Sequence, residues 1–287
     1  MNTVASDSAI AVVVVSYRSG ATLDECLTRL RASEGAREIV VVDNASDDNS
    51  VELTARHANE DARIIPLRNA DNVGFGRACN LGGRRCTAPF IAFVNPDCWV
   101  EPDSLSRLRE HLGRTAGGLI GADLVDCHGV RDPAARRREP TIARMLKGMG
   151  TRVSVAIQID PHADVQPVDA VSGALMLMPY ALFASLGGFD EAYRLHAEDL
   201  DLCRRVRDGG HAVLVANDVR VVHVRGVSSR TRPVFVEWHK HKGLWHYFRK
   251  FEGRSAGLLM RTIAFAAMWA HFLFAAPRAW LGTLGQR

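Results

Sequence analysis

The chain has 287 residues, of which 47% are hydrophobic, and a formal net charge of +4. This length and apolar content exclude a disordered chain and allow one large domain, or one domain with an appendage. The charge is uneven, because 12 Lys and Arg but only two acids lie from residue 220 onward, which leaves −6 on the preceding residues. The basic and apolar C-terminal segment predicts an anionic partner, and a membrane is favoured over nucleic acid.

The N-terminus and the cysteines both indicate a cytoplasmic protein. No basic region with a long apolar core precedes residue 11, and the run Ala11–Val15 is too short for the core of a signal peptide. The six cysteines contain no CxxC pair, so reduced thiols are the simplest interpretation.

Strand-like and helix-like segments alternate along the first hundred residues. The continuous β-branched run Ile10–Val15 predicts a buried strand, and short connections between such segments favour a parallel α/β sheet. Further strands are expected at 39–42, 64–67, 90–94, 119–125, 169–179, 212–215 and 220–224. Helices are expected from about Leu23, after a cap at 46–48, from 72–77 through about Cys86, and at 102–112, 180–186 and 199–207, with a loop at 132–140.

The tail from Val234 to Arg287 is expected to be helical. Its segment Leu258–Ala276 is strongly apolar but is interrupted by Arg261 and His271, which makes it marginal for crossing a membrane. An amphipathic anchor lying in the plane of the membrane is therefore favoured, and packing against the body or a homodimer partner is the alternative. On one helix, the residues that would share a face or its flank are Lys250, Arg254, Arg261, Trp269 and Trp280.

Asp43 and Asn44 follow a predicted strand and precede a predicted helix. A carboxylate or amide oxygen at the carboxyl end of a buried strand can accept the imide N–H of uracil or thymine. The alternative is that both residues only form the turn and cap the helix. The residue types alone leave these interpretations equally weighted.

The segment Asn72–Asn80 places glycines and Arg77 at the start of a predicted helix. Backbone N–H groups and a guanidinium suit a diphosphate or a ribose. The spacing matches neither a Rossmann fingerprint nor a Walker lysine loop, which makes a nicotinamide-dependent oxidoreductase the weakest functional class.

Asn95-Pro96-Asp97 also follows a predicted strand, so Asp97 is a candidate ligand of a metal–diphosphate. A hard cation needs few protein ligands here, because phosphate oxygens and water complete its shell. His223, at the end of a later strand, is a candidate second ligand, although a lone histidine there is more often structural. Cys98 is expected to be a buried bystander.

The densest acidic cluster is Glu198-Asp199-Leu200-Asp201. Asp199 and Asp201 cannot share one helix face, so at most one points fully into a site. Asp199 is the candidate general base for direct displacement at an anomeric carbon, with Glu198 beside it. The alternative is that the acids cap a helix and pair with its arginines. Gly173, in a predicted strand, suggests a close approach to a ligand.

Taken in order, eight segments resemble the family-2 inverting glycosyltransferases, which have a GT-A fold. They span about Ile10 to Ser228, and their ordered co-occurrence is more specific than any one of them. The branch most similar is that of rhamnosyltransferase-type enzymes, which often use dTDP-L-rhamnose. The segments are VVVVSYRSG, VVDNASDDNS, NVGFGRACNLGG, FVNPDCWV, VSGALMLMP, GGFDE, AEDLDLCRRVRDGGH and VVHVRG.

The resemblance implies a role for each matching residue. Asp43 and Asn44 would lie at the nucleobase and Arg77 near the nucleotide. Asp97 would hold the metal–diphosphate, with Mg²⁺ or Mn²⁺ and His223 as a second contact, and Asp199 would be the catalytic base. The remaining residues of the implied set are Ser16, Gly74, Asn95 and Gly173 at the donor and Glu198 beside the base.

Two departures from the family pattern bear on chemistry. Asn95 stands where the metal motif often has a second acid, which makes metal dependence less certain. His196 stands where an aromatic residue is frequent, which affects acceptor choice.

The resemblance implies a GT-A domain at 1–228, with a mostly parallel nucleotide-binding sheet flanked by helices and a smaller acceptor-side subregion. A basic amphipathic tail follows at 229–287, and its segment 237–251 is similar to helices of enzymes that act on polyprenyl-diphosphate acceptors. We therefore expect an inverting transferase on the inner face of the cell membrane. It would move a sugar, foremost L-rhamnose from dTDP-L-rhamnose, to a lipid-linked or glycan acceptor. The alternatives are another hexosyl- or N-acetylhexosaminyl-transferase that uses a UDP-sugar, or a silent nucleotide-sugar-binding scaffold.

Overall fold

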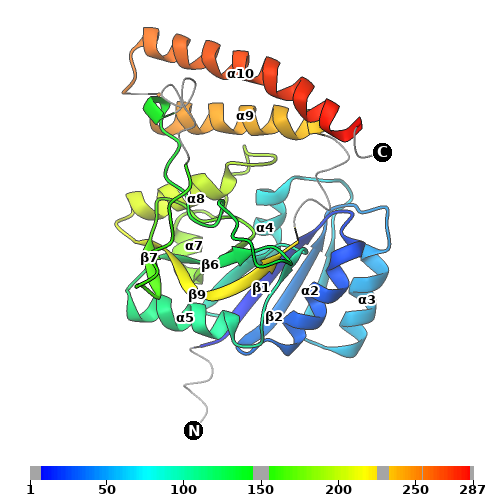
Figure 1. Ribbon diagram of the computed structural model, residues 1–287. Helices are drawn as coiled ribbons and strands as arrows, with labels where there is room; N and C mark the ends of the chain where they lie inside the picture. Colours follow the sequence, from blue (N-terminus) through cyan, green and yellow to red (C-terminus); the bar gives the residue numbers. More distant parts are fainter. Residues whose placement is uncertain (1–7, 145–154, 225–232, 254, 285–287) are drawn as a thin grey trace.

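The computed structural model describes residues 8–144, 155–224, 233–253 and 255–284, with no side-chain description beyond 281. Within these ranges nine strands form one sheet in the order β3-β2-β1-β4-β8-β6-β9-β5, and β7 pairs with β9 (Figure 1). The strands are β1 Ile10–Ser16, β2 Ala36–Asp43, β3 Ile64–Arg68, β4 Phe90–Val94, β5 Cys98–Trp99, β6 Leu119–Val125, β7 Val165–Pro167, β8 Leu175–Pro179 and β9 Val213–His223. The helices are α2 Gly20–Ala32, α3 Ser50–Glu60, α4 Phe75–Gly83, α5 Ser104–Arg114, α7 Tyr180–Ser185, α8 Glu198–Asp208, α9 Pro233–Phe251 and α10 Leu258–Leu284.

The alternation of side chains along β1 divides the core into two layers. Ile10, Val12 and Val14 pack in a buried cluster with apolar residues of α2 and α5. Ala11 and Val13 belong to a second cluster, which includes apolar residues of α4, α7, α8 and α9. Because every residue of β1 is buried, the strand is apolar on both faces, as expected for a central parallel strand covered by helices.

The predicted parallel half of the sheet is confirmed, since β3, β2, β1 and β4 are parallel neighbours. The second half is mixed. Strand β8 runs antiparallel between β4 and β6, and β5 runs antiparallel to β9. These antiparallel pairs bring segments that are far apart in the sequence to the carboxyl end of β4.

Several predicted boundaries are wrong. The expected strands at 212–215 and 220–224 are one strand, β9. The polar residues between them remain in the strand because the register of its pairing with β6 shifts there. The strand expected from residue 169 begins only at Leu175. Helix α3 begins at Ser50, and within the expected cap at 46–48 it is Asp48 that accepts the Ser50 N–H. Helix α4 ends at Gly83 rather than near Cys86.

The expectation of one continuous cationic face in the tail is also wrong. The tail forms two helices, α9 and α10, which lie side by side above the body in Figure 1. Lys250 therefore belongs to a different helix from Arg261, while Arg254 and the proposed 228/229 boundary lie outside the described residues.

Helix α9 is docked on the body by burial and by charge. Tyr247 and Phe248 are each 1% exposed. The Lys250 ammonium donates to Asp190 and to the fully buried Asp201, each at 2.6 Å. Gly243 lies so close to the turn before α8 that an added Cβ would meet the His196 carbonyl oxygen at 2.6 Å. The helix is thus part of the core rather than a detached appendage.

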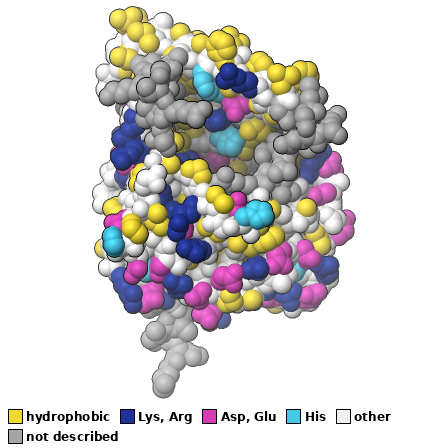
Figure 2. Space-filling view, viewed as in Figure 1, with side chains coloured by type: hydrophobic (Ala, Val, Ile, Leu, Met, Phe, Trp, Pro, Cys, Tyr) yellow, Lys and Arg dark blue, Asp and Glu magenta, His cyan; other side chains and the backbone are white. Residues whose placement is uncertain are grey.

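Helix α10 has the opposite character. Its segment Leu258–Leu281 has a mean hydropathy of 1.5, and only 11% of its most apolar window is buried, so its length and composition suffice to cross a membrane. Large apolar side chains, including Leu259, Phe274 and Leu281, are more than half exposed. Hydrophobic atoms accordingly crowd the upper edge of the molecule in Figure 2.

We predict that Gly243→Ala lowers the free energy of unfolding by about 1–3 kcal/mol, because the methyl group must displace backbone at the α9 contact. Gly113→Ala is the matched control: it lies in α5 with no atom within 4 Å of an added Cβ, and it should gain roughly 0.5–1 kcal/mol. Denaturant unfolding in detergent measures both. Equal stabilisation by the two variants would contradict this docking of α9.

Candidate functional site

The candidate site begins at the carboxyl ends of three neighbouring parallel strands. Ser16 ends β1, Asp43 ends β2 and Asn95 directly follows β4. In open α/β sheets this edge is where ligands bind. The sheet thus brings together three of the predicted donor-binding residues.

Each of these three residues has a buried polar atom left without a partner. Ser16 Oγ, Asp43 Oδ1 and Asn95 Oδ1 accept no hydrogen bond from any described residue. Asp43 Oδ2, by contrast, accepts the Ser46 N–H at 3.1 Å. Since buried polar groups are normally satisfied, unpaired acceptors at a strand edge suit a ligand that carries N–H or O–H donors. A pocket of about 370 Å³ lies next to the end of β2 and is lined by Ala45, Ser46, Arg68, Asn69 and Ala70.

Asn44 is engaged differently. Its Oδ1 accepts from Asn69 Nδ2 at 3.1 Å and from the Val73 N–H at 3.0 Å. Its Nδ2 donates to Asn72 Oδ1 at 3.1 Å and to the Gly74 carbonyl at 3.5 Å. The amide therefore orders the loop before α4 with all of its hydrogen-bonding capacity.

Gly74 and Arg77 were expected at the donor nucleotide, but their contacts are to other parts of the protein. Gly74 has a φ of +92°, and an added Cβ would meet the Arg194 carbonyl oxygen at 2.7 Å, so its close approach is to protein backbone. Arg77 is exposed on α4, with Nε 3.6 Å from Glu191 Oε2. No contact among the described residues links Arg77 to Asp43 or Asp97.

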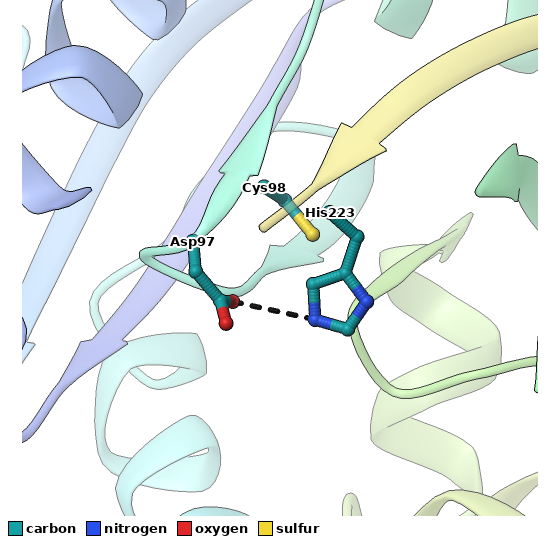
Figure 3. A group of neighbouring side chains, drawn as sticks. All are labelled: Asp97, Cys98 and His223. Carbon is teal, nitrogen blue, oxygen red and sulfur yellow. Dashed lines mark ion pairs between the residues drawn. The ribbon is translucent and has the colours of Figure 1, made fainter. Parts of the chain in front are cut away.

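Asp97 and His223 meet, as expected from the sequence. The pairing of β5 with β9 sets Cys98 opposite His223, and His223 Nε2 lies 3.4 Å from Asp97 Oδ1 (Figure 3). His223 Nδ1 lies 3.3 Å from Asp132 Oδ2, on the loop that follows β6. The Asp132 carboxylate thus orients the His223 ring so that Nε2 points toward Asp97.

A divalent cation fits this group. Ligand atoms of Asp97, Cys98 and His223 all lie within 4.8 Å of one another. Burial, together with the neighbouring Asp97, raises the pKa of the Cys98 thiol well above its usual value, so the sulfur is a poor metal ligand at neutral pH. A carboxylate and an imidazole remain, with the unpaired Asn95 Oδ1 nearby in the chain. That set suits Mn²⁺ or Mg²⁺ if a diphosphate completes the shell.

The second acidic cluster begins helix α8. Asp199 Oδ2 accepts from Arg137 Nη2 at 2.5 Å and from the Gly173 N–H at 3.0 Å, and Oδ1 accepts from the Leu200 N–H at 2.8 Å. Burial alone would raise the pKa of Asp199, but Arg137 and these backbone donors hold it below its usual value. Asp199 is therefore a fixed carboxylate that stays ionised at neutral pH.

Glu198 has the opposite environment. It is 7% exposed, and its Oε2 has no hydrogen-bond partner among the described residues. Burial and the negative charge of Asp199 raise the pKa of Glu198, which favours the neutral acid. The two adjacent carboxyl groups are thus driven to opposite protonation states.

Asp201 points away from Asp199, in agreement with helical geometry. It is fully buried and bonds Arg205, Lys250 and Tyr193. The alternative that these acids pair with Arg204, Arg205 and Arg207 holds only for Arg205, which pairs with Asp201. Arg204 and Arg207 instead bond Glu139 of the loop after β6. Asp201 is an anchor for α9 rather than part of the site.

Arg137 is the functional candidate that sequence reasoning missed. It lies in the polar, proline-broken segment 132–140, for which the sequence predicts only a loop over the sheet. Arg136 is instead buried against Asp123, while Arg137 reaches Asp199 and the Val171 carbonyl. The sequence offered one hint of a role for Arg137: three consecutive arginines occur within residues 1–219, which together carry a net negative charge.

The two halves of the site are linked through backbone. The Asn95 N–H donates to the Ala174 carbonyl at 2.9 Å, and the adjacent Gly173 N–H donates to Asp199. An added Cβ at Gly173 would lie 3.3 Å from Asp199 Cβ, so the glycine allows the carboxylate to approach. The Asn95–Asp97 turn and Asp199 are therefore separated by one strand end.

A family model described as "Glycosyl transferase family 2" matches residues 11–162, more than half of the chain. A curated relative, the N-acetylglucosaminyl-diphospho-decaprenol L-rhamnosyltransferase of Mycobacterium tuberculosis, is 27% identical over 248 residues, which cover 78% of each chain.

Two solved structures share the fold. A mannosyltransferase from Pyrobaculum calidifontis, in complex with GDP-Man and Mn²⁺, has a TM-score of 0.62 and 18% identity, over 96% of this chain and 74% of that one. GalNAc-T7 with UDP, GalNAc and Mn²⁺ has a TM-score of 0.63 and 15% identity, over 77% of this chain and 44% of that one. The predicted GT-A fold is confirmed.

We predict that Asp97→Asn weakens Mn²⁺ binding by at least about tenfold, because it removes the charged ligand of the cluster. Titration followed by electron paramagnetic resonance, in the presence of dTDP or UDP, measures this. Glu110→Gln, which removes an exposed carboxylate of α5, is the control and should leave the affinity unchanged. Equal affinities for both variants would place the metal elsewhere.

Proposed function

The chain belongs to glycosyltransferase family 2, and from this premise we propose that it transfers a sugar from a nucleotide-sugar donor, with inversion, to a hydroxyl of a lipid-linked or glycan acceptor. The proposed donor is dTDP-L-rhamnose. Its support is the relative whose name describes an L-rhamnosyltransferase acting on N-acetylglucosaminyl-diphospho-decaprenol. The observation that carries the mechanism is the ionised Asp199 carboxylate, one strand end away from the Asn95–Asp97 turn.

The donor nucleotide is proposed to bind at the strand ends. Asp43 Oδ1 would accept the imide N–H of the base, with the Ser16 hydroxyl as a neighbouring polar group. Asn44 and Gly74 would shape the adjoining loop rather than touch the base, because their contacts are to protein. Arg77 would lie at the periphery of the nucleotide site, because it is exposed on α4.

The diphosphate is proposed to lie beside Asp97 and His223, which would hold Mg²⁺ or Mn²⁺. Structural neighbours with the same fold contain both Mn²⁺ and a nucleotide or nucleotide sugar, which supports this proposal. When bound, such a cation neutralises charge that develops on a leaving diphosphate. Asp132 would orient the His223 ring.

Asp199 is proposed to act as the general base. As the acceptor oxygen forms its bond to the anomeric carbon, Asp199 takes the hydroxyl proton, and the bond from that carbon to the diphosphate oxygen breaks. Displacement from the opposite face inverts the anomeric configuration. Glu198, held as a neutral acid, is not a second base in this scheme, and it contributes by avoiding a further negative charge beside Asp199.

We propose that the enzyme works on the inner face of the cell membrane, with α10 in contact with lipid. Support comes from the exposed apolar face of α10 and from the lipid-linked substrate in the relative's name. A UDP-hexose or UDP-N-acetylhexosamine donor is the competing assignment. A panel of nucleotide sugars, scored by product mass, separates these donors.

We predict that Asp199→Asn lowers kcat by roughly 10²–10⁴-fold with little change in donor affinity, because it removes the base but keeps the shape. Asp208→Asn, at the exposed end of the same helix, is the control and should retain activity. Radiometric transfer and dTDP or UDP binding are measured on each. Undiminished turnover by Asp199→Asn would eliminate the proposed base, and nuclear magnetic resonance of the product tests inversion.

We predict that Arg137→Gln moves the acidic limb of the kcat/KM profile to higher pH. Arg137 lowers the pKa of Asp199, so its loss raises that pKa and protonates the base at a pH where the wild-type enzyme is active. Rates from pH 5 to 9 measure the shift. A profile that fell uniformly without moving would show that Arg137 acts only on structure.

A further inference from the structure

A pocket lies between the body and the two C-terminal helices. Its volume is about 340 Å³, within the range of about 300–1,000 Å³ that is usual for small-ligand sites. Figure 2 shows a recess beneath the upper helices, in which acidic, histidine and hydrophobic side chains are visible. The apolar walls come from Ile142, Leu200, Leu244, Phe248, Ala264 and Met268.

Cations surround this apolar interior. Arg138 and Lys240 line the pocket from the loop after β6 and from α9. No ion pair or side-chain hydrogen bond of Arg138 is found among the described residues, and Lys240 makes one long contact, 3.5 Å to Glu237. An apolar hollow whose rim carries Arg138 and Lys240 matches an amphiphile that has an anionic head and an apolar chain.

The pocket adjoins the proposed base. Arg137 lines it and also donates to Asp199. Leu200, the residue after Asp199, forms another part of the wall. A molecule seated here would therefore place its head beside the reacting hydroxyl's expected position.

One wall of the pocket, formed by α10, has an exposed apolar face on its other side. Ala264 and Met268 of α10 point inward and are buried, whereas Leu259, Ile263 and Phe274 of the same helix are exposed. A helix that is apolar on both faces suits a wall between a protein cavity and a bilayer.

We propose that this pocket binds the head-proximal isoprenoid segment of the acceptor lipid, with Arg138 and Lys240 taking its phosphates. The inference rests on the proposed function, and it adds the place on the protein where the acceptor lipid binds. The volume allows a short stretch of chain, while the rest of the lipid would remain in the membrane.

Farnesyl diphosphate tests the site directly, because it carries an isoprenoid chain and a diphosphate without any sugar. Ala264→Trp should fill the pocket and weaken its binding to the full-length protein at least about tenfold, which corresponds to 1.4 kcal/mol. Ala266→Trp places the same side chain at an exposed position of α10 and should bind like wild type. Undiminished binding by Ala264→Trp would overturn the proposal.

A second variant, with a reversed charge at the rim of the pocket, tests the site even if Ala264→Trp fails to fold. Arg138→Glu should weaken binding of farnesyl diphosphate by roughly tenfold or more but leave farnesol unaffected. Lys242→Glu reverses an exposed charge of α9 outside the pocket and should have no effect. Equal losses for Arg138→Glu and Lys242→Glu would mean non-specific attraction and would refute the site.

Sugar transfer is scored separately on N-acetylglucosaminyl-diphospho-decaprenol in micelles. Wild-type protein that binds farnesyl diphosphate in the pocket but transfers no sugar would contradict the proposed function and not this site. Wild-type protein that transfers sugar, with Ala264→Trp transferring equally well, would contradict this site and not the function.

Discussion

The backbone hydrogen bond from Asn95 to Ala174 fixes the relation between the two halves of the site. It exists because β8 runs antiparallel between β4 and β6, so that the chain enters β8 beside the turn that leaves β4. Gly173 then presents its N–H to Asp199 from the opposite side. The Asn95–Asp97 turn and Asp199, about a hundred residues apart, are thus held by one strand end rather than by a flexible loop. This is the rigid support that the proposed roles of Asp97 and Asp199 require.

A second constraint joins the loop after β6 to the helices around it. Glu139 accepts from Tyr247 of α9 at 2.7 Å and pairs with Arg204 and Arg207 of α8. Burial opposes ionisation of Glu139, but these donors keep its pKa below the usual value. The charged network lies next to Arg137, so a segment without regular secondary structure can still carry the group that lowers the pKa of Asp199.

Local patterns in the sequence predicted much of this structure. The apolar runs predicted β1, β2 and β4 because a strand buried on both faces has little choice of residue. Polar residues such as Asp43 and Asp97 were predicted at the ligand-binding edge because they follow such strands. Long-range pairs were not predictable in the same way. Nothing local distinguishes Arg137 from Arg138, or shows that Lys250 bonds Asp201, because burial of each depends on how distant elements pack. The break between α9 and α10 was missed since both helices are apolar enough to read as one.

The apolar outer face of α10 changes how the reaction would be described quantitatively. A protein seated on a lipid layer meets its lipid substrate by diffusion in two dimensions, so the relevant substrate concentration is a mole fraction in the surface rather than an amount per unit volume. Adding inert lipid would then slow turnover at constant total substrate, and apparent constants would vary with the detergent-to-lipid ratio.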